Sequence, residues 1–223
     1  MAYEFNGTNQ RITAASPSGL SDVPFTLACW FNSQRDTGNR CLLQVGNFAT
    51  SQRCTIFAMG NVAGDPVRLQ VQGSTATASN NTSTGWTTNT WNHACGTAKV
   101  TGSFPFQEFA VYLNAGGKVT GTSNVGAPSS AWSSTSIGVQ QTNGNINTGT
   151  YFDGLIAEAG IWNVALTDDE IASLAKGVTC NLVRPQSLVF YAPLIRELQD
   201  IKGGLALTNN NGATVADHTR VYQ

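Results

Sequence analysis

Apolar and polar residues alternate along much of this chain, and residues 25–31 (FTLACWF) show the pattern clearly. Under the two-residue period of a strand, Phe25, Leu27, Cys29 and Phe31 fall on one face. Similar short runs recur between loops rich in Gly, Asn, Ser and Asp. We therefore predict strands at residues 10–14, 25–32, 40–46, 54–59, 67–71, 91–100, 108–113, 118–122, 136–140, 187–194 and 205–208.

Two polar stretches interrupt this series of strands. Residues 73–89 are dominated by Ser, Thr, Asn and Gly, which predicts an exposed loop or a weak edge strand. Residues 141–150 are expected to form a second polar loop. Short strands at this spacing, with turn signals between them, indicate a β-sandwich or a barrel.

The one strong helix signal lies in residues 151–177, which predict a long strand, a turn and a helix over about 167–176. Thr167 and Glu170 have the spacing of a capping box, in which each side chain bonds the other residue's amide. Leu166 and Ile171 have the spacing of a hydrophobic staple, and Gly177 provides the stop. The acidic residues 168–170 could suggest a metal site, but capping and the helix dipole account for all three.

Composition narrows the class of protein. The 223 residues suit a single all-β domain, 1–223, whose segment 180–223 is expected to pack back on the sandwich as a C-terminal extension. Only 11% of residues are charged and the net charge is −1, which argues against a nucleic-acid partner. No apolar run is long enough for a membrane span, so no membrane partner is expected.

The N-terminal sequence lacks the basic start and apolar core of a secretory signal. We expect either that a signal was removed from an extracellular protein, or that the protein is made in a cytoplasm and reaches the outside by another route.

The five cysteines show no metal-binding or redox spacing. Their strand-like surroundings predict buried, reduced thiols that pack as small apolar residues. A disulfide such as Cys41–Cys54 is the alternative, which the sequence leaves open.

Several segments, taken in order, resemble the laminin-G-like and pentraxin-like domains of the concanavalin A-like superfamily. They are FTLACWF at 25–31, WNH at 91–93, VYLNAG at 111–116, FDGLIAE at 152–158, IW at 161–162 and AL at 165–166, before the acidic helix start. The resemblance covers about residues 25–177. It implies a two-sheet antiparallel jelly-roll sandwich with one short helix laid across an edge.

The tail, residues 182–189 and 216–220, is similar to tails that follow such domains in bacteriophage and prophage proteins. That similarity implies a virion location, which fits the missing signal because virion proteins are released by lysis.

Catalytic residues are not expected. A glycosidase needs paired carboxylates, and Asp153 and Glu158 are predicted to face opposite sides of one strand. Glu108 stands alone. His93 and Cys95 share a strand face, but no second base or carboxylate lies near them in sequence, so we interpret His93 as structural. His218, in the tail, is expected to be exposed.

Trp86 and Trp132 are the candidate ligand-binding residues, because both lie in polar sequence where an indole can stack on a sugar ring. The alternative is that each closes one end of the sandwich, while Trp30, Trp91 and Trp162 are expected in the core. Relatives often bind calcium through rim loops, so no cofactor is assigned but calcium stays open. The loop residues that could supply its ligands are Asp36, Asn39, Asp65, Asn143 and Asn145.

The sequence thus predicts a non-enzymatic interaction or adhesion module, displayed on a phage virion as a capsid decoration or fibre component. Its expected partners are capsid or tail proteins, sibling subunits of a homo-oligomer and host glycans. The alternative is a free carbohydrate-binding lectin, and the sequence leaves open whether its binding requires calcium.

Overall fold

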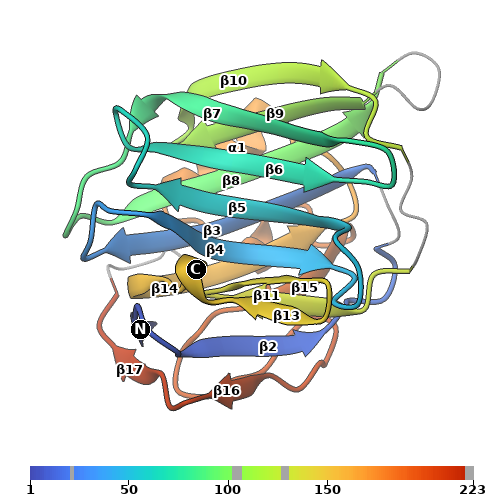
Figure 1. Ribbon diagram of the computed structural model, residues 1–223. Coiled ribbons are helices and arrows are strands. Elements are labelled where there is room, and N and C mark those ends of the chain that lie inside the picture. The colour runs from blue at the N-terminus through green and yellow to red at the C-terminus, as the bar shows by residue number, and fades with distance from the viewer. Residues whose placement is uncertain (21–22, 102–106, 127–130, 219–223) are drawn as a thin grey trace.

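The computed structural model describes residues 1–20, 23–101, 107–126 and 131–218, and it is a sandwich of two stacked antiparallel sheets (Figure 1). This confirms the predicted all-β, two-sheet jelly-roll class. In the described part of the chain, no helix is long and apolar enough to cross a membrane.

The first sheet has eight strands in the order β10-β9-β8-β3-β14-β1-β17, and β15 also pairs with β14. Its members are β1 (Ala2–Asn6), β3 (Phe25–Ser33), β8 (Asn92–Val100), β9 (Gln107–Leu113), β10 (Gly116–Ser123), β14 (Asp153–Trp162), β15 (Leu188–Ala192) and β17 (Thr214–Ala216).

The second sheet has seven strands in the order β16-β2-β11-β4-β5-β6-β7. Its members are β2 (Arg11–Ala15), β4 (Asn39–Gly46), β5 (Arg53–Met59), β6 (Pro66–Gln72), β7 (Thr77–Gly85), β11 (Ser134–Ile137) and β16 (Thr208–Asn210). A separate hairpin is formed by β12 (Gln140–Thr142) and β13 (Asn145–Asn147), followed by the 3-10 helix η1 (Thr148–Thr150).

The main core lies between the two sheets. Phe25 and Phe31 of β3 and Phe109 of β9 contribute from one side, and Leu43 of β4 and Ile56 of β5 from the other. Each of these side chains is at most 2% exposed. Burying a side chain of this size stabilises the fold by about 1.5–3 kcal/mol, so the alternating pattern dictates which face turns inward.

The helix α1 (Asp168–Ala175) begins and ends as its sequence predicts. Thr167 Oγ1 accepts from the Glu170 amide at 3.4 Å, and the Glu170 carboxylate accepts from the Thr167 amide at 2.8 Å. After the helix, Gly177 adopts a φ of 95°, which favours glycine. Ile171 and Leu174 pack with Trp162 in a second apolar cluster that joins α1 to the eight-stranded sheet.

Asp168 in the first turn of α1 has a structural role. It accepts from Tyr112 Oη and from Lys118 Nζ, each at 2.8 Å, and so joins the helix to β9 and β10. These two contacts lower the pKa of the Asp168 carboxyl. The acidic helix start is therefore explained by structure, as the sequence indicates.

The first strand and one of the two polar stretches differ from expectation. β1 was not predicted, although it pairs with both β14 and β17 in the eight-stranded sheet. Residues 73–89 contain the edge strand β7, one of the two predicted forms. The expected polar loop at 141–150 is instead the β12–β13 hairpin with η1, because neighbouring polar residues pair with each other across it.

Three strands of the segment 180–223 join the sandwich. β15 pairs with β14, β16 pairs with β2 and β17 pairs with β1, so the segment contributes to both sheets. Arg220, which ends the tail that resembles phage proteins, lies outside the described residues.

The cysteines are all buried. Cys41 belongs to a small outer cluster with Phe57 and Met59, whereas Cys54 lies in the main core on the other face of the same sheet. A Cys41–Cys54 disulfide is therefore wrong for this fold. Burial raises the pKa of the Cys29 thiol to about 12, which keeps it protonated at neutral pH.

A β-bulge in β14 corrects the prediction that Asp153 and Glu158 face opposite sides. Ile156 and Ala159, three residues apart, both point into the main core, so one extra residue is inserted between Ala157 and Gly160. Glu158 lies in this bulge with a φ of 51°. The strict alternation on which the prediction was based does not hold here.

We expect Thr167→Ala to lower the free energy of unfolding by about 1 kcal/mol, because the capping hydroxyl is lost. Thr167→Ser keeps the hydroxyl and should retain most of the stability. Urea unfolding of the two variants measures this, and an equal loss in both would contradict the capping role.

We expect Glu158→Gln to gain stability relative to the unmodified protein as pH rises. Burial raises the pKa of the Glu158 carboxyl, so the folded state holds a proton that the unfolded state releases. The free energy of unfolding of the unmodified protein therefore decreases as pH rises from the ordinary carboxyl pKa to the raised one. Thermal unfolding at about pH 4 and pH 7 tests this, and a pH-independent difference between the two proteins would contradict it.

Candidate functional site

The outer face of the seven-stranded sheet carries the candidate site. On β5, Cys54, Ile56 and Ala58 point into the main core. The alternate residues of the strand, which include Arg53 and Phe57, therefore point outward.

The neighbouring strand β6 repeats this arrangement. Val67, Leu69 and Val71 belong to the main core, so Arg68 and Gln70 point outward beside β5. The register places Phe57 opposite Arg68, and Thr55 opposite Gln70. Two adjacent strands thus present a guanidinium, an amide and an aromatic ring side by side.

The β12–β13 hairpin closes one side of this face. Gln44 Nε2 of β4 donates to the Gln141 carbonyl at 2.8 Å, and the Gln141 amide donates to Gln44 Oε1 at 3.1 Å. At the end of η1, Thr150 Oγ1 accepts from the Gln140 amide at 3.0 Å. These bonds convert a flat sheet face into a hollow.

We call this hollow the arginine–amide pocket. Its volume is about 180 Å³. Its walls are mostly polar, with Phe57 and Met59 supplying the apolar part. The residues that line it are Asn39, Arg53, Phe57, Met59, Arg68, Gln70, Gln140, Asn147 and Thr150.

Arg53 is held firmly in the wall and is 9% exposed. Its guanidinium donates to the Ser51 carbonyl, to Thr142 Oγ1 at 3.0 Å and to Gln70 Oε1 at 3.4 Å. Gln140 Oε1 accepts from Asn147 Nδ2 at 2.8 Å, and the opposite amide orientation would instead bring its oxygen 2.9 Å from Arg53 Nε. Neutral acceptors from three segments therefore fix this cation in place.

Arg68 is held by one end only. Its Nε donates to Asn81 Oδ1 of β7 at 2.7 Å, and no described residue accepts from its two terminal nitrogens. Burial lowers the pKa of both Arg68 and Arg53, but a guanidinium stays protonated in proteins.

The pocket carries positive charge without a carboxylate in its lining. Among the described residues, four ion pairs are present, and neither pocket arginine takes part in any of them. They join Arg35 to Asp153, Lys99 to Glu108, Lys118 to Asp168 and Arg184 to Glu170.

Trp86 and Trp132 lie away from this pocket. Trp86 is 4% exposed in the main core, with its ring 6.1 Å from Phe31 edge to face. Trp132 is half-buried, and its ring lies 6.3 Å from Phe25. The geometry favours the alternative role, in which these indoles close the sandwich, over stacking on a sugar.

Of the three tryptophans expected in the core, only Trp162 is fully buried. Trp30 and Trp91 are half-buried. Trp30 lies 5.4 Å from the His93 ring, and Trp91 lies 4.3 Å from the His218 ring. His218 is half-buried rather than exposed, because these indoles cover it.

His93 is fully enclosed, as expected for a structural histidine. Burial lowers its pKa to about 3, so the ring is neutral at physiological pH. Burial also raises the pKa of Cys95, so no thiolate forms beside it.

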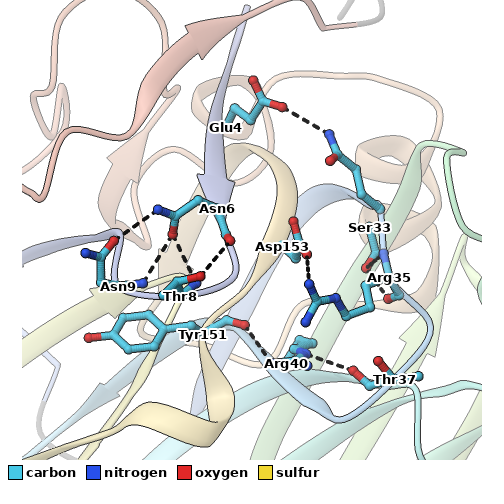
Figure 2. A network of polar contacts seen from close by, with 11 residues as sticks. Glu4, Asn6, Thr8, Asn9, Ser33, Arg35, Thr37, Arg40, Tyr151 and Asp153 are labelled. Carbon is cyan, nitrogen blue, oxygen red and sulfur yellow. Dashed lines mark hydrogen bonds and ion pairs between the residues drawn. The ribbon is translucent and has the colours of Figure 1, made fainter.

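A second hollow of about 340 Å³ lies beside β1 and the start of β14. Figure 2 shows Asp153 paired with Arg35 at 3.0 Å, and Arg40 donating to the Tyr151 carbonyl at 3.1 Å. In the same network Glu4 Oε1 accepts from Gln34 at 3.0 Å. The carboxylates of Glu4 and Asp153 therefore each bind a neighbouring donor.

The loop residues named as calcium candidates do not converge with other acids. Asn39 lines the arginine–amide pocket, whereas Asn143 and Asn145 lie on the β12–β13 hairpin. Within the described ranges, no group of three His, Cys, Asp or Glu side chains could hold a metal ion. Calcium binding stays a prediction.

A third hollow, of about 430 Å³, includes Glu158 and Tyr191. The buried Tyr191 hydroxyl donates to Glu158 Oε2. Asp153 has a different partner, Arg35, and lines a different hollow. The two carboxylates thus do not form the acid–nucleophile pair that a glycosidase needs.

Sequence reasoning missed Arg53 and Arg68 as site residues. A usable signal was present in VRLQVQ at residues 67–72, where Arg and Gln alternate with apolar residues along one strand. The signal was weak because such residues usually form an ordinary solvated face. The covering β12–β13 hairpin is what distinguishes this face from an ordinary solvated one.

Comparisons with known proteins identify the family to which the fold belongs. No curated protein sequence matches the chain. The family model described as the concanavalin A-like lectin/glucanases superfamily matches residues 6–172. A heptameric pentraxin from Limulus polyphemus aligns with a TM-score of 0.63 and 15% identity, over 96% of this chain and 93% of the pentraxin.

Two carbohydrate complexes also share the fold. Domain 4 of an extracellular arabinanase from Geobacillus stearothermophilus, in complex with arabinotriose, has a TM-score of 0.58 and 21% identity, over 78% of this chain and 76% of that one. The sialidase module CBM40 from Ruminococcus gnavus, bound to α2,3-sialyllactose, has a TM-score of 0.54 and 11% identity, over 70% of this chain and 84% of that module.

The family model covers more than half of the chain. The chain belongs to the concanavalin A-like lectin/glucanases superfamily.

Proposed function

We propose that this protein is a non-enzymatic carbohydrate-binding module and that the arginine–amide pocket is its binding site. The observation that carries the proposal is the gathering of amide and guanidinium groups in one hollow on the outer sheet face. This favours the lectin alternative over a purely structural virion role.

The lining groups match the chemistry of a sugar. Gln70 and Asn147 supply amides that can donate to and accept from hydroxyls. Phe57 and Met59 also line the pocket but are at most 4% exposed, so its polar groups supply most of the surface that a ligand can contact. The volume of about 180 Å³ is below the range for drug-sized ligands, so the pocket suits one ring of a longer glycan.

The structural neighbours support the class of ligand but not its identity. Two of them are described with bound saccharides, and both are named as parts of enzymes. At 11–21% identity the likeness shows the fold alone. The choice of site therefore rests on this chain's own residues.

A virion location and a homo-oligomer stay as predictions, since the pentraxin, arabinanase and sialidase neighbours do not bear on a capsid or tail. Glycan binding is compatible with display on a particle. Co-purification of the protein with intact particles would test that location separately.

We expect the protein to bind glycans on an array, and Asn147→Ala to weaken binding about threefold to tenfold, because one or two hydrogen bonds to the ligand are lost. Asn145→Ala is the matched control, since Asn145 lies on the same hairpin, is exposed and does not line the pocket. Isothermal titration with the best array ligand measures both variants.

Absence of glycan binding to the folded protein would contradict the proposed function. Equal losses for the two asparagine variants would place the site elsewhere. Loss of binding on chelation alone, with both variants unaffected, would instead favour a calcium-dependent site outside the pocket.

A further inference from the structure

Arg68 presents an open hydrogen-bonding fork to the arginine–amide pocket. Asn81 holds its Nε at 2.7 Å, which orients the guanidinium plane. Its Nη1 and Nη2 have no acceptor among the described residues, and neither is buried beyond reach of solvent. The two terminal nitrogens of Arg68 are thus oriented by Asn81 but have no hydrogen-bond acceptor among the described residues.

Arg53 adds a second charge beside this fork without competing for the same ligand. Its terminal nitrogens donate to Ser51, Thr142 and Gln70, and Gln140 is the further acceptor when its amide oxygen is turned toward Arg53. All four are neutral, so its charge is solvated by dipoles and is not neutralised.

The pocket therefore holds two partly buried cations that the protein leaves uncompensated. Buried charge is costly unless it is paired, and the lining offers only amides, a hydroxyl and apolar groups. Because the whole chain has a net charge of −1, this positive field is local to the pocket. An anionic ligand would relieve the cost.

We propose that the pocket recognises acidic glycans, whose carboxylate binds the two terminal nitrogens of Arg68 while the sugar hydroxyls bind the surrounding amides. This rests on the proposed glycan-binding function and names its ligand class. A carboxylate matches a single guanidinium fork in charge and geometry. With the donors of Arg53 already occupied, a second fork for a doubly charged phosphate is absent from the described lining.

The test compares three forms of one ligand: the acidic glycan that binds best on the array, its methyl ester and its neutral parent lacking the acidic sugar. Titration calorimetry at low and moderate salt gives the affinities. We expect the acid to bind about tenfold to a hundredfold more tightly than the ester, with the difference shrinking as salt rises.

Variants of Arg68 give the second arm. Arg68→Gln should reduce affinity for the acid to that of the ester, and a far-UV circular dichroism spectrum like that of the unmodified protein shows that the variant is folded. Arg68→Lys should recover only part of the loss, because the charge returns without the fork. The control is Arg196→Gln, an exposed residue outside the pocket lining.

The outcomes separate this inference from the proposed function. Equal binding of acid, ester and neutral parent would overturn the inference while glycan binding stands. Binding of acetate at Arg68, with no glycan bound, would overturn both the glycan function and the ligand class based on it. An unchanged preference for the acid in Arg68→Gln would also overturn the inference.

Discussion

The face-to-face packing of two sheets is the constraint on which the rest of the structure depends. Every strand that turns apolar side chains inward must turn the alternate residues outward, so the core decides the composition of the outer face. On β5 and β6, burial of Ile56 and Leu69 leaves Phe57, Arg68 and Gln70 on the outside. The pocket is thus a consequence of the core pattern together with one covering hairpin.

Much of the fold could be predicted because its signals are local. The alternation at 25–31 and the capping box at Thr167 each specify an element without tertiary information. β1 was missed because only pairing with β14 and β17 makes it a strand. The faces of Asp153 and Glu158 were misassigned because a bulge is set by packing, and no local rule reveals it.

The site was less accessible to sequence reasoning for a related reason. An indole in polar sequence has a visible pattern, yet Trp86 is buried against Phe31 once the sheets meet. Arg53 and Arg68 look like ordinary surface residues until Gln44 and Gln141 pin the hairpin beside them. The pocket combines segments that are about ninety residues apart, and such a combination appears only in three dimensions.

Among the described residues, each carboxylate of the four ion pairs has a cationic partner, whereas the two arginines of the arginine–amide pocket take part in no ion pair. Asp168 binds Tyr112 and Lys118, and Asp153 binds Arg35, so these carboxylates have structural partners. The most direct test of the account is an NMR titration of the labelled protein with the best glycan ligand. We predict that amide shifts concentrate in β5, β6 and the β12–β13 hairpin; shifts confined to the surroundings of Trp86, Trp132 or Glu158 would contradict it.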